Sequence, residues 1–191
     1  MYHNIVKEVK SEKGSLKIYL DNCPEDPRNW DNMSKMVCFH RKYNLGDDHN
    51  YKVGDYSGWH ELAEAIEKDY DIAVMVPLYM YDHTGITIST TPFSCPWDSG
   101  QIGWAFITKD VIRKRFGMKR VSAKAKEKAL EILLAEVQVY DEYLRGAVYG
   151  YTLEDKNGDV IDSCWGFYGD WKKITNYIPK EYNDLIKKAI A

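Results

Sequence analysis

Hydrophobic and polar residues alternate at the start of the chain, on both sides of Lys13-Gly14. Segments 4–10 and 15–20 mix apolar and polar residues in the alternating manner that is typical of half-buried strands. The pattern therefore predicts an N-terminal β-hairpin. Further strands are predicted over 36–40, 71–82, 86–90 and 102–108. Pro77 interrupts one of them and favours an edge position or a bulge, because proline has no N–H for a ladder.

A second periodicity, of three and four residues, runs from about Ser122 to Arg145 and is followed by Gly146. It predicts a long helix closed by a glycine C-cap. Shorter helices are predicted behind a Ser57 cap, over 109–117 and over 180–191. Residues 147–166 predict another hairpin, with Asn157-Gly158 in a tight primed turn that requires positive φ at both positions.

Paired strands with separate helices predict an α+β fold rather than a doubly wound parallel sheet. We expect antiparallel sheets with hairpins, one long helix at about 122–145, and the shorter helices packed on one side. The length of 191 residues fits a single domain over 1–191. Within it, the helix, hairpin and helix of 122–191 are a candidate C-terminal subdomain.

The composition indicates in which cellular compartment the protein is expected. The four cysteines are too few and too widely spaced for a disulfide framework. No apolar run reaches the roughly 20 residues that span a bilayer, and the N-terminus lacks the apolar core of a signal peptide. We therefore expect a cytoplasmic protein with reduced thiols, without a membrane partner.

Charge is unevenly distributed although the net charge is only -3. Residues 61–104 hold seven acidic residues and one lysine, whereas 105–129 hold nine basic residues and two acidic ones. This predicts a dipolar surface. The basic segment is a candidate nucleic-acid contact, with a solvated helix face as the alternative. Its candidate phosphate contacts are Arg113, Lys114, Arg115, Lys119 and Arg120, and Phe116 could stack on a base.

Two loops, over 21–32 and 91–104, are rich in proline and aspartate yet contain tryptophan. Large aromatic side chains beside acids are typical of protein-binding hot spots. The sequence therefore predicts a partner-binding surface, with Pro96 and Gly100 holding the tip of the second loop. The candidate contact residues are Trp30, Asp31, Trp97, Asp98 and Gln101.

Three catalytic or metal-binding alternatives were weighed. Cys95 with a histidine could act as a thiol nucleophile, although its acidic surroundings disfavour a thiolate. Cys38 and His40, with Cys95 and His83, could hold zinc, but no CxxC or HxxxH pair is present. The loop aspartates could serve a metal-dependent hydrolase. No phosphate-binding glycine motif occurs. We predict no catalytic residues, no metal and no cofactor, with a thiol- or metal-dependent small hydrolase as the alternative.

The segment "YLRGAVYGY" resembles the ArdA antirestriction proteins of plasmids and phages. Tyr143, Gly146, Val148 and Gly150 fit their Y-x-x-G-x-L-x-G spacing, and Glu154 lies near the family's acid. Thr152 stands where that family has tryptophan. The stretches 18–47 and 91–104 resemble an uncharacterised family common on phage and plasmid genomes of Gram-positive bacteria.

The resemblance implies a role in the contest between a mobile element and its host, of the anti-CRISPR or antirestriction type. The leading hypothesis is an accessory protein that inhibits a host defence nuclease by stoichiometric binding, with or without contact to its RNA or DNA. A nucleic-acid-binding accessory protein is a further alternative, and a homodimer stays open.

Overall fold

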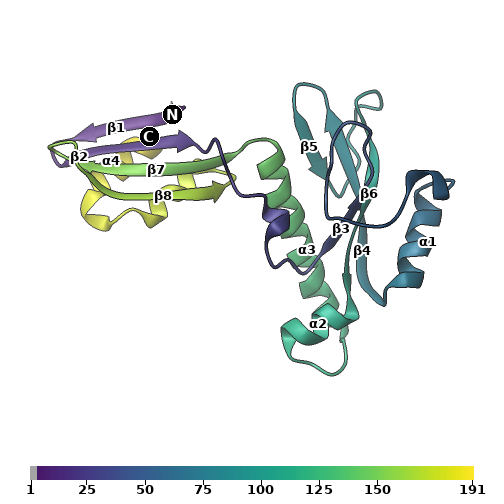
Figure 1. The fold of residues 1–191 in the computed structure, drawn as a ribbon. Helices are drawn as coiled ribbons and strands as arrows, with labels where there is room; N and C mark the ends of the chain where they lie inside the picture. The colour runs from purple at the N-terminus through teal and green to yellow at the C-terminus, as the bar shows by residue number, and fades with distance from the viewer. Residues whose placement is uncertain (1–3) are drawn as a thin grey trace. The chain divides into compact units, whose positions relative to one another are not determined.

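The computed structural model describes residues 4–191, which form two four-stranded antiparallel sheets with accompanying helices (Figure 1). The predicted α+β fold is confirmed. The chain divides into two compact units, a first unit of Met1–Asp26 with Glu142–Ala191 and a second unit of Pro27–Asp141. The single domain over 1–191, with 122–191 as a subdomain, stays a prediction. Among residues 4–191 no helix has both the length and the apolar content to cross a membrane.

The first unit is built on a sheet of order β1-β2-β7-β8. Its strands are β1 (Ile5–Ser11), β2 (Gly14–Leu20), β7 (Val148–Asp155) and β8 (Val160–Tyr168). The predicted N-terminal hairpin forms, and its second strand pairs with β7 from the far end of the sequence. Leu16, Ile18 and Leu153 project from one face into the core. That core is completed by η3 (Trp171–Tyr177), η4 (Lys180–Tyr182) and α4 (Asn183–Ile190).

The turn between β7 and β8 corrects one sequence prediction. Only Gly158 has a positive φ, of 90°, so the primed turn predicted at Asn157-Gly158 is wrong. The Asp155 carboxylate instead accepts hydrogen bonds from the backbone N–H groups of Asn157 and Asp159, at 2.7 and 3.0 Å. A side chain that bonds the backbone two residues on stabilises an ordinary turn, and glycine is then needed at one position only.

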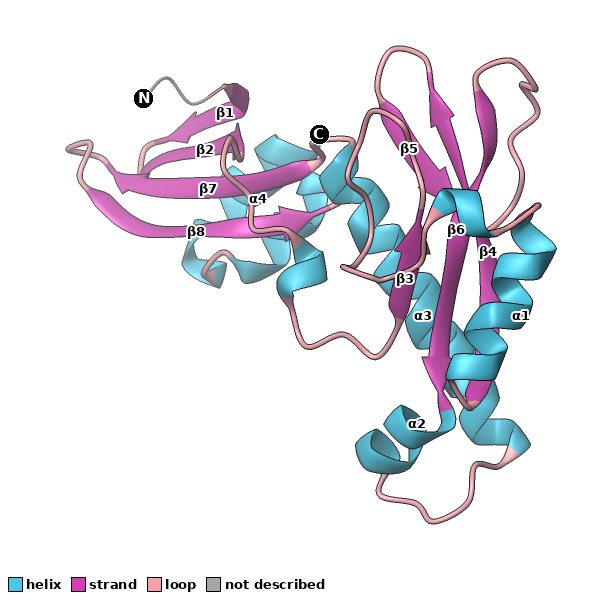
Figure 2. Cartoon of the chain, turned by 45° about the vertical axis from the view of Figure 1, so that its right-hand side comes forward, coloured by secondary structure: helices cyan, strands magenta, loops and turns pink. Residues whose placement is uncertain are grey.

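The second unit is built on a sheet of order β3-β6-β4-β5 (Figure 2). Its strands are β3 (Lys35–Cys38), β4 (Ile72–Asp82), β5 (Ile86–Ser89) and β6 (Ser99–Thr108). Pro77 pairs with Trp104 of β6, while β5 pairs only with Tyr79–Asp82. The other side of β4 is therefore unpaired at Pro77, which is the local edge position that its missing N–H requires.

Helices pack on both faces of this sheet. Leu62 and Ile66 of α1 (Trp59–Asp69) pack against Val37 and Phe106. The long helix α3 (Ala123–Leu144) lies against the other face and confirms the helix predicted over about 122–145 (Figure 2). Between β6 and α3 lies α2 (Lys109–Phe116). Short turns η1 (Pro27–Asn29) and η2 (Val53–Asp55) interrupt the long loops.

Buried polar groups fasten α3 to the loops of the second unit. The Glu136 carboxylate accepts the backbone N–H groups of Met33 and Ser34, at 2.8 and 2.9 Å. The Tyr140 hydroxyl accepts the N–H of Gly46 at 2.9 Å. These bonds satisfy buried backbone donors and fix the loops that lead into and out of β3.

Candidate functional site

The loop between β5 and β6 presents Trp97 to solvent, with 92% of its side chain exposed. The loop is nevertheless well ordered. The Ser99 hydroxyl donates to the carbonyl of Cys95, and the N–H of Asp82 donates to the carbonyl of Asp98 at 2.8 Å. His83 Nδ1 lies 3.2 Å from the Asp98 carboxylate. These contacts hold the loop from which the largely exposed indole projects.

A polar pocket of about 400 Å³ lies beside this tryptophan. Residues 39–42 form one wall, and Trp97, Asp98 and Gln101 line it as well. Lys42 Nζ lies 3.4 Å from the Asp82 carboxylate inside the pocket. Gln101 donates from Nε2 to the carbonyl of Gly103 at 3.2 Å. Three of the five predicted partner-binding residues thus share one concave site.

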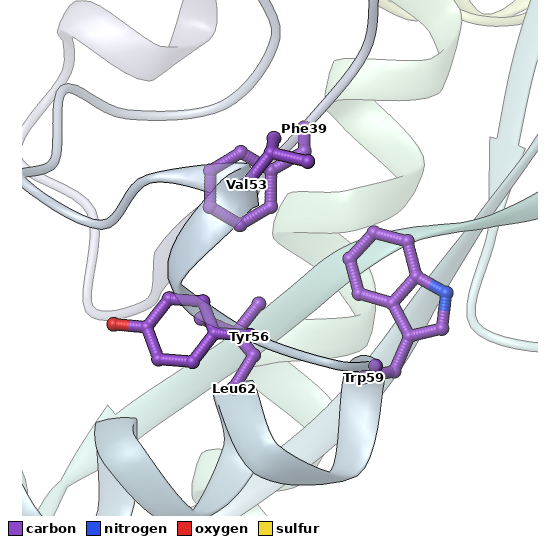
Figure 3. Close-up of a pocket in the computed structure, with 6 residues that line it drawn as sticks. Phe39, Val53, Tyr56, Trp59 and Leu62 are labelled. Atoms are coloured by element: carbon purple, nitrogen blue, oxygen red, sulfur yellow. The ribbon is translucent and has the colours of Figure 1, made fainter.

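The second unit also has a smaller apolar pocket, of about 100 Å³ (Figure 3). Its lining is almost wholly apolar, from η2, the start of α1 and the end of β3: Phe39, Val53, Tyr56, Gly58, Trp59 and Leu62. Val53 is largely exposed at its rim. The ring N–H of Trp104 donates to the carbonyl of Trp59 at 3.0 Å, which fixes the first turn of α1. Pockets of this composition accept an aliphatic or aromatic side chain.

Phe39 lines both pockets, so the polar pocket and the apolar pocket adjoin. We call Trp97 together with these two pockets the Trp97 surface. It combines an exposed aromatic anchor with a concave apolar site and a polar surround. Interfaces concentrate their binding energy in such an arrangement, where a few apolar anchors are shielded from water by polar neighbours.

Trp30 and Asp31, the other two predicted partner contacts, lie elsewhere in the second unit. Asp31 forms an ion pair with Arg115 of α2 at 2.5 Å. That helix follows the last residue of β6, whereas Trp97 precedes its first residue. Ten strand residues separate the two ends of β6, about 33 Å. The two tryptophan loops therefore do not converge on one site.

The basic segment is partly neutralised by carboxylates of its own unit. Lys109 and Arg113 both pair with Asp71, at 2.5 and 3.6 Å, and the Lys109 hydrogen bond lowers the pKa of that carboxyl. Lys114 pairs with Asp110 at 2.8 Å. These pairs reduce the positive field available to phosphates.

Two of the predicted phosphate contacts are not neutralised in this way. Lys119 and Arg120 form no ion pair with any residue of 4–191. Phe116, the predicted base-stacking residue, has the ammonium of Lys128 5.5 Å from its ring centre. Nucleic-acid contact through this segment stays a prediction.

The thiols do not form a familiar catalytic arrangement. The Cys95 thiol donates to the Asp98 carboxylate at 3.8 Å, and the same carboxylate faces His83. The carboxylate thus lies between thiol and imidazole, whereas thiol hydrolases place the imidazole next to the thiol. Cys38 is buried, and burial raises the pKa of its thiol to about 12. Within 4–191 no three His, Cys, Asp or Glu side chains gather as a metal site.

Sequence reasoning missed the part played by residues 39–59. Phe39, Tyr56 and Trp59 shape the apolar pocket, and none of the three is among the predicted partner-binding residues. The available signal was the presence of several aromatic residues within the long polar stretch 41–58. Comparison of the chain with models of known families, with curated proteins and with solved structures found no match.

Proposed function

We propose that the protein acts by stoichiometric binding to a protein partner through the Trp97 surface. One observation carries the proposal: a tryptophan exposed to 92% on a loop held by its own hydrogen bonds. An ordered loop loses little conformational entropy on binding, and an indole buries more apolar area than most side chains. Trp97 is therefore the side chain in this unit with most to gain from a partner.

We further propose that the partner is a host defence nuclease, a restriction enzyme or a CRISPR effector. The resemblance to phage- and plasmid-borne proteins supplies this context. Asp82 and Asp98 line the polar pocket beside Trp97, together with Arg41 and Lys42, so the pocket offers carboxylates as well as basic groups to a partner. Carboxylates of this kind complement the Arg- and Lys-lined channels in which nucleases hold nucleic acid.

The test is a titration against DNA cleavage by purified restriction enzymes and by guide-loaded CRISPR effectors. Inhibition should reach its end point near one protein per nuclease. Trp97→Ala should weaken inhibition at least about tenfold, the loss typical of a hot-spot residue. Trp30→Ala serves as the matched control and should change inhibition less than about threefold, because Trp30 lines neither pocket of the Trp97 surface.

Two other outcomes would contradict the proposal in distinguishable ways. Inhibition at trace amounts that disappears in Cys95→Ala would identify a thiol enzyme. Affinity for plain DNA or RNA that falls steeply with salt, and that depends on Lys119 and Arg120, would identify a nucleic-acid-binding protein.

A further inference from the structure

A third and larger cleft, of about 640 Å³, adjoins the Trp97 surface. Its floor is β3 with Phe106 of β6, and its walls are residues 47–51 and the last turn of α1. Tyr56 lines both this cleft and the apolar pocket, so the two are neighbours. We call it the Tyr70 cleft.

Two carboxylates of the Tyr70 cleft lack a counter-ion. Asp47 is held by Arg28, but Asp48 and Asp69 form no ion pair with any residue of 4–191. Asp69 is also the last residue of α1, where the helix carbonyl groups already concentrate negative charge. A carboxylate in that place costs stability unless a cation approaches. With Asp47 paired to Arg28, Lys35 is the basic residue that lines the cleft against Asp48 and Asp69, so the lining keeps a net negative charge.

Tyrosine rings line the cleft together with these carboxylates. Tyr51 donates its hydroxyl to the Asp69 carboxylate at 2.9 Å, and its ring lies 6.2 Å from that of Tyr56. The ammonium of Lys35 lies 5.5 Å from the ring centre of Tyr70, so one aromatic face of the cleft already carries a cation. Cations bind to tyrosine faces through the ring quadrupole, most strongly where water is excluded.

His49 has a hydrogen-bond acceptor atom that no donor contacts. Its Nε2 lies 3.1 Å from the carbonyl of Cys38, which can only accept, so Nε2 carries the proton. In the neutral ring Nδ1 is then an acceptor, and it is buried without a hydrogen-bond partner. Buried polar atoms of this kind are uncommon, and a donor that reached this nitrogen would complete its hydrogen bonding.

We propose that the Tyr70 cleft binds the guanidinium group of an arginine side chain on the protein partner. Guanidinium stacks flat on tyrosine and donates several N–H bonds at once to carboxylate and imidazole acceptors. An ammonium ion cannot match both features. The assignment to a protein partner rests on the proposed function, whereas binding of guanidinium itself does not.

Binding is tested first with a small probe, Nα-acetyl-arginine methylamide, followed by NMR of the labelled full chain. Saturable shifts should centre on His49, Tyr51 and Tyr70. The isosteric neutral probe, the corresponding citrulline derivative, should bind at least about fivefold more weakly, because it lacks the charge. Equal affinity for both probes, or shifts centred outside the cleft, would overturn the proposal.

Variants separate ligand binding from folding. Asp69→Asn keeps an acceptor for Tyr51 while removing the charge, and it should weaken the arginine probe at least about fivefold. The matched control Glu64→Gln removes an equal charge from the same helix outside the cleft and should leave affinity unchanged. Lys35→Gln should strengthen binding about two- to fivefold, since it removes the competing cation from Tyr70. No purely structural role for these residues predicts that gain, and an unchanged or weakened affinity in Lys35→Gln would count against the proposal.

The nuclease titration distinguishes this inference from the proposed function. If Trp97→Ala abolishes inhibition and Asp69→Asn does not affect it, the proposed function stands and the arginine assignment fails. If no nuclease is inhibited while the arginine probe binds the cleft, the guanidinium site stands and the proposed function fails.

Discussion

At the scale of single residues, the ion pair between Arg28 and Asp47 anchors the loops that flank β3. The Arg28 side chain is only 5% exposed and donates to both Asp47 oxygens, at 3.0 and 2.7 Å. It also donates to the carbonyl of Ser34, and Asp47 accepts the N–H of Met36. The two residues thus join the start of β3 to the segment 47–51, which forms a wall of the Tyr70 cleft.

Asp47→Ala should therefore destabilise the protein by about 3 kcal/mol, since it leaves a buried guanidinium without its carboxylate. Chemical denaturation at pH 7 measures the change in the free energy of unfolding. Asp48→Ala is the control from the adjacent, exposed position and should change stability by less than about 0.5 kcal/mol. Equal losses in the two variants would show that the pair does not hold this region.

The four thiols make a second prediction at this scale. Cys23 and Cys164 are exposed, whereas Cys38 is buried and burial raises the pKa of its thiol to about 12. Only the thiolate reacts with alkylating reagents. At pH 8 iodoacetamide should therefore modify Cys23 and Cys164 in the native protein and reach Cys38 only after unfolding, as followed by mass spectrometry. Modification of native Cys38 at the rate of Cys23 would contradict the burial.

At the scale of elements, the pairing of β3 with β6 depends on Gly103. A Cβ at this residue would lie 1.9 Å from the carbonyl oxygen of Val37, a backbone atom that cannot move alone. Gly103→Ala should push the short strand β3 away from β6 and destabilise the protein by about 3 kcal/mol or more. Because β3 leads into Phe39, which lines the apolar pocket, the variant should also lose partner binding through the Trp97 surface.

Gly100→Ala provides the control within the same strand. A Cβ there meets no atom within 4 Å, and the residue does not have a positive φ. Its free energy of unfolding should stay within about 0.5 kcal/mol of the wild-type value. If Gly103→Ala is equally mild in denaturation experiments, the close approach of the two strands is not a constraint.

Local signals explain which elements were predictable from the sequence. The periodicity of 122–145 and the alternation around Gly14 report local burial, and both elements formed as expected. The pairing of β2 with β7 joins segments more than a hundred residues apart, and no local pattern encodes it. The primed turn predicted at Asn157-Gly158 was wrong, because hydrogen bonding to the Asp155 side chain determines the turn type.

The candidate site was predictable only in part, for the same reason. Trp97, Asp98 and Gln101 are close in sequence and share a pocket, whereas Trp30 was grouped with them by composition alone. Asp69 and Tyr51 could not be linked from sequence, since a helix end and a loop meet only in the folded second unit. Residue type indicates what a side chain can bind, but the fold decides which side chains act together.

At the scale of the whole molecule, tyrosines with a raised pKa should set the alkaline limit of stability. Burial raises the pKa of Tyr51, Tyr151 and Tyr168 above the ordinary value of 10, in the case of Tyr168 to about 12. Well below pH 10 these tyrosines are protonated in both the folded and the unfolded state, so their ionisation does not affect stability. Above pH 10 the unfolded chain loses their protons first, so stability falls as the pH rises toward 12. Lys17, whose pKa is raised by its hydrogen bond to Glu154, adds to the fall in the same direction.

Tyr151→Phe tests this account, because it removes one titrating group. The Tyr151 hydroxyl donates to the Asp162 carboxylate at 2.6 Å, so the variant should lose about 1–2 kcal/mol at pH 7. Its urea midpoint should nevertheless decline less steeply than that of the wild type between pH 9.5 and 11.5, since one fewer proton is released on unfolding. Parallel declines would mean that Tyr151 ionises equally in both states and does not contribute to the alkaline limit.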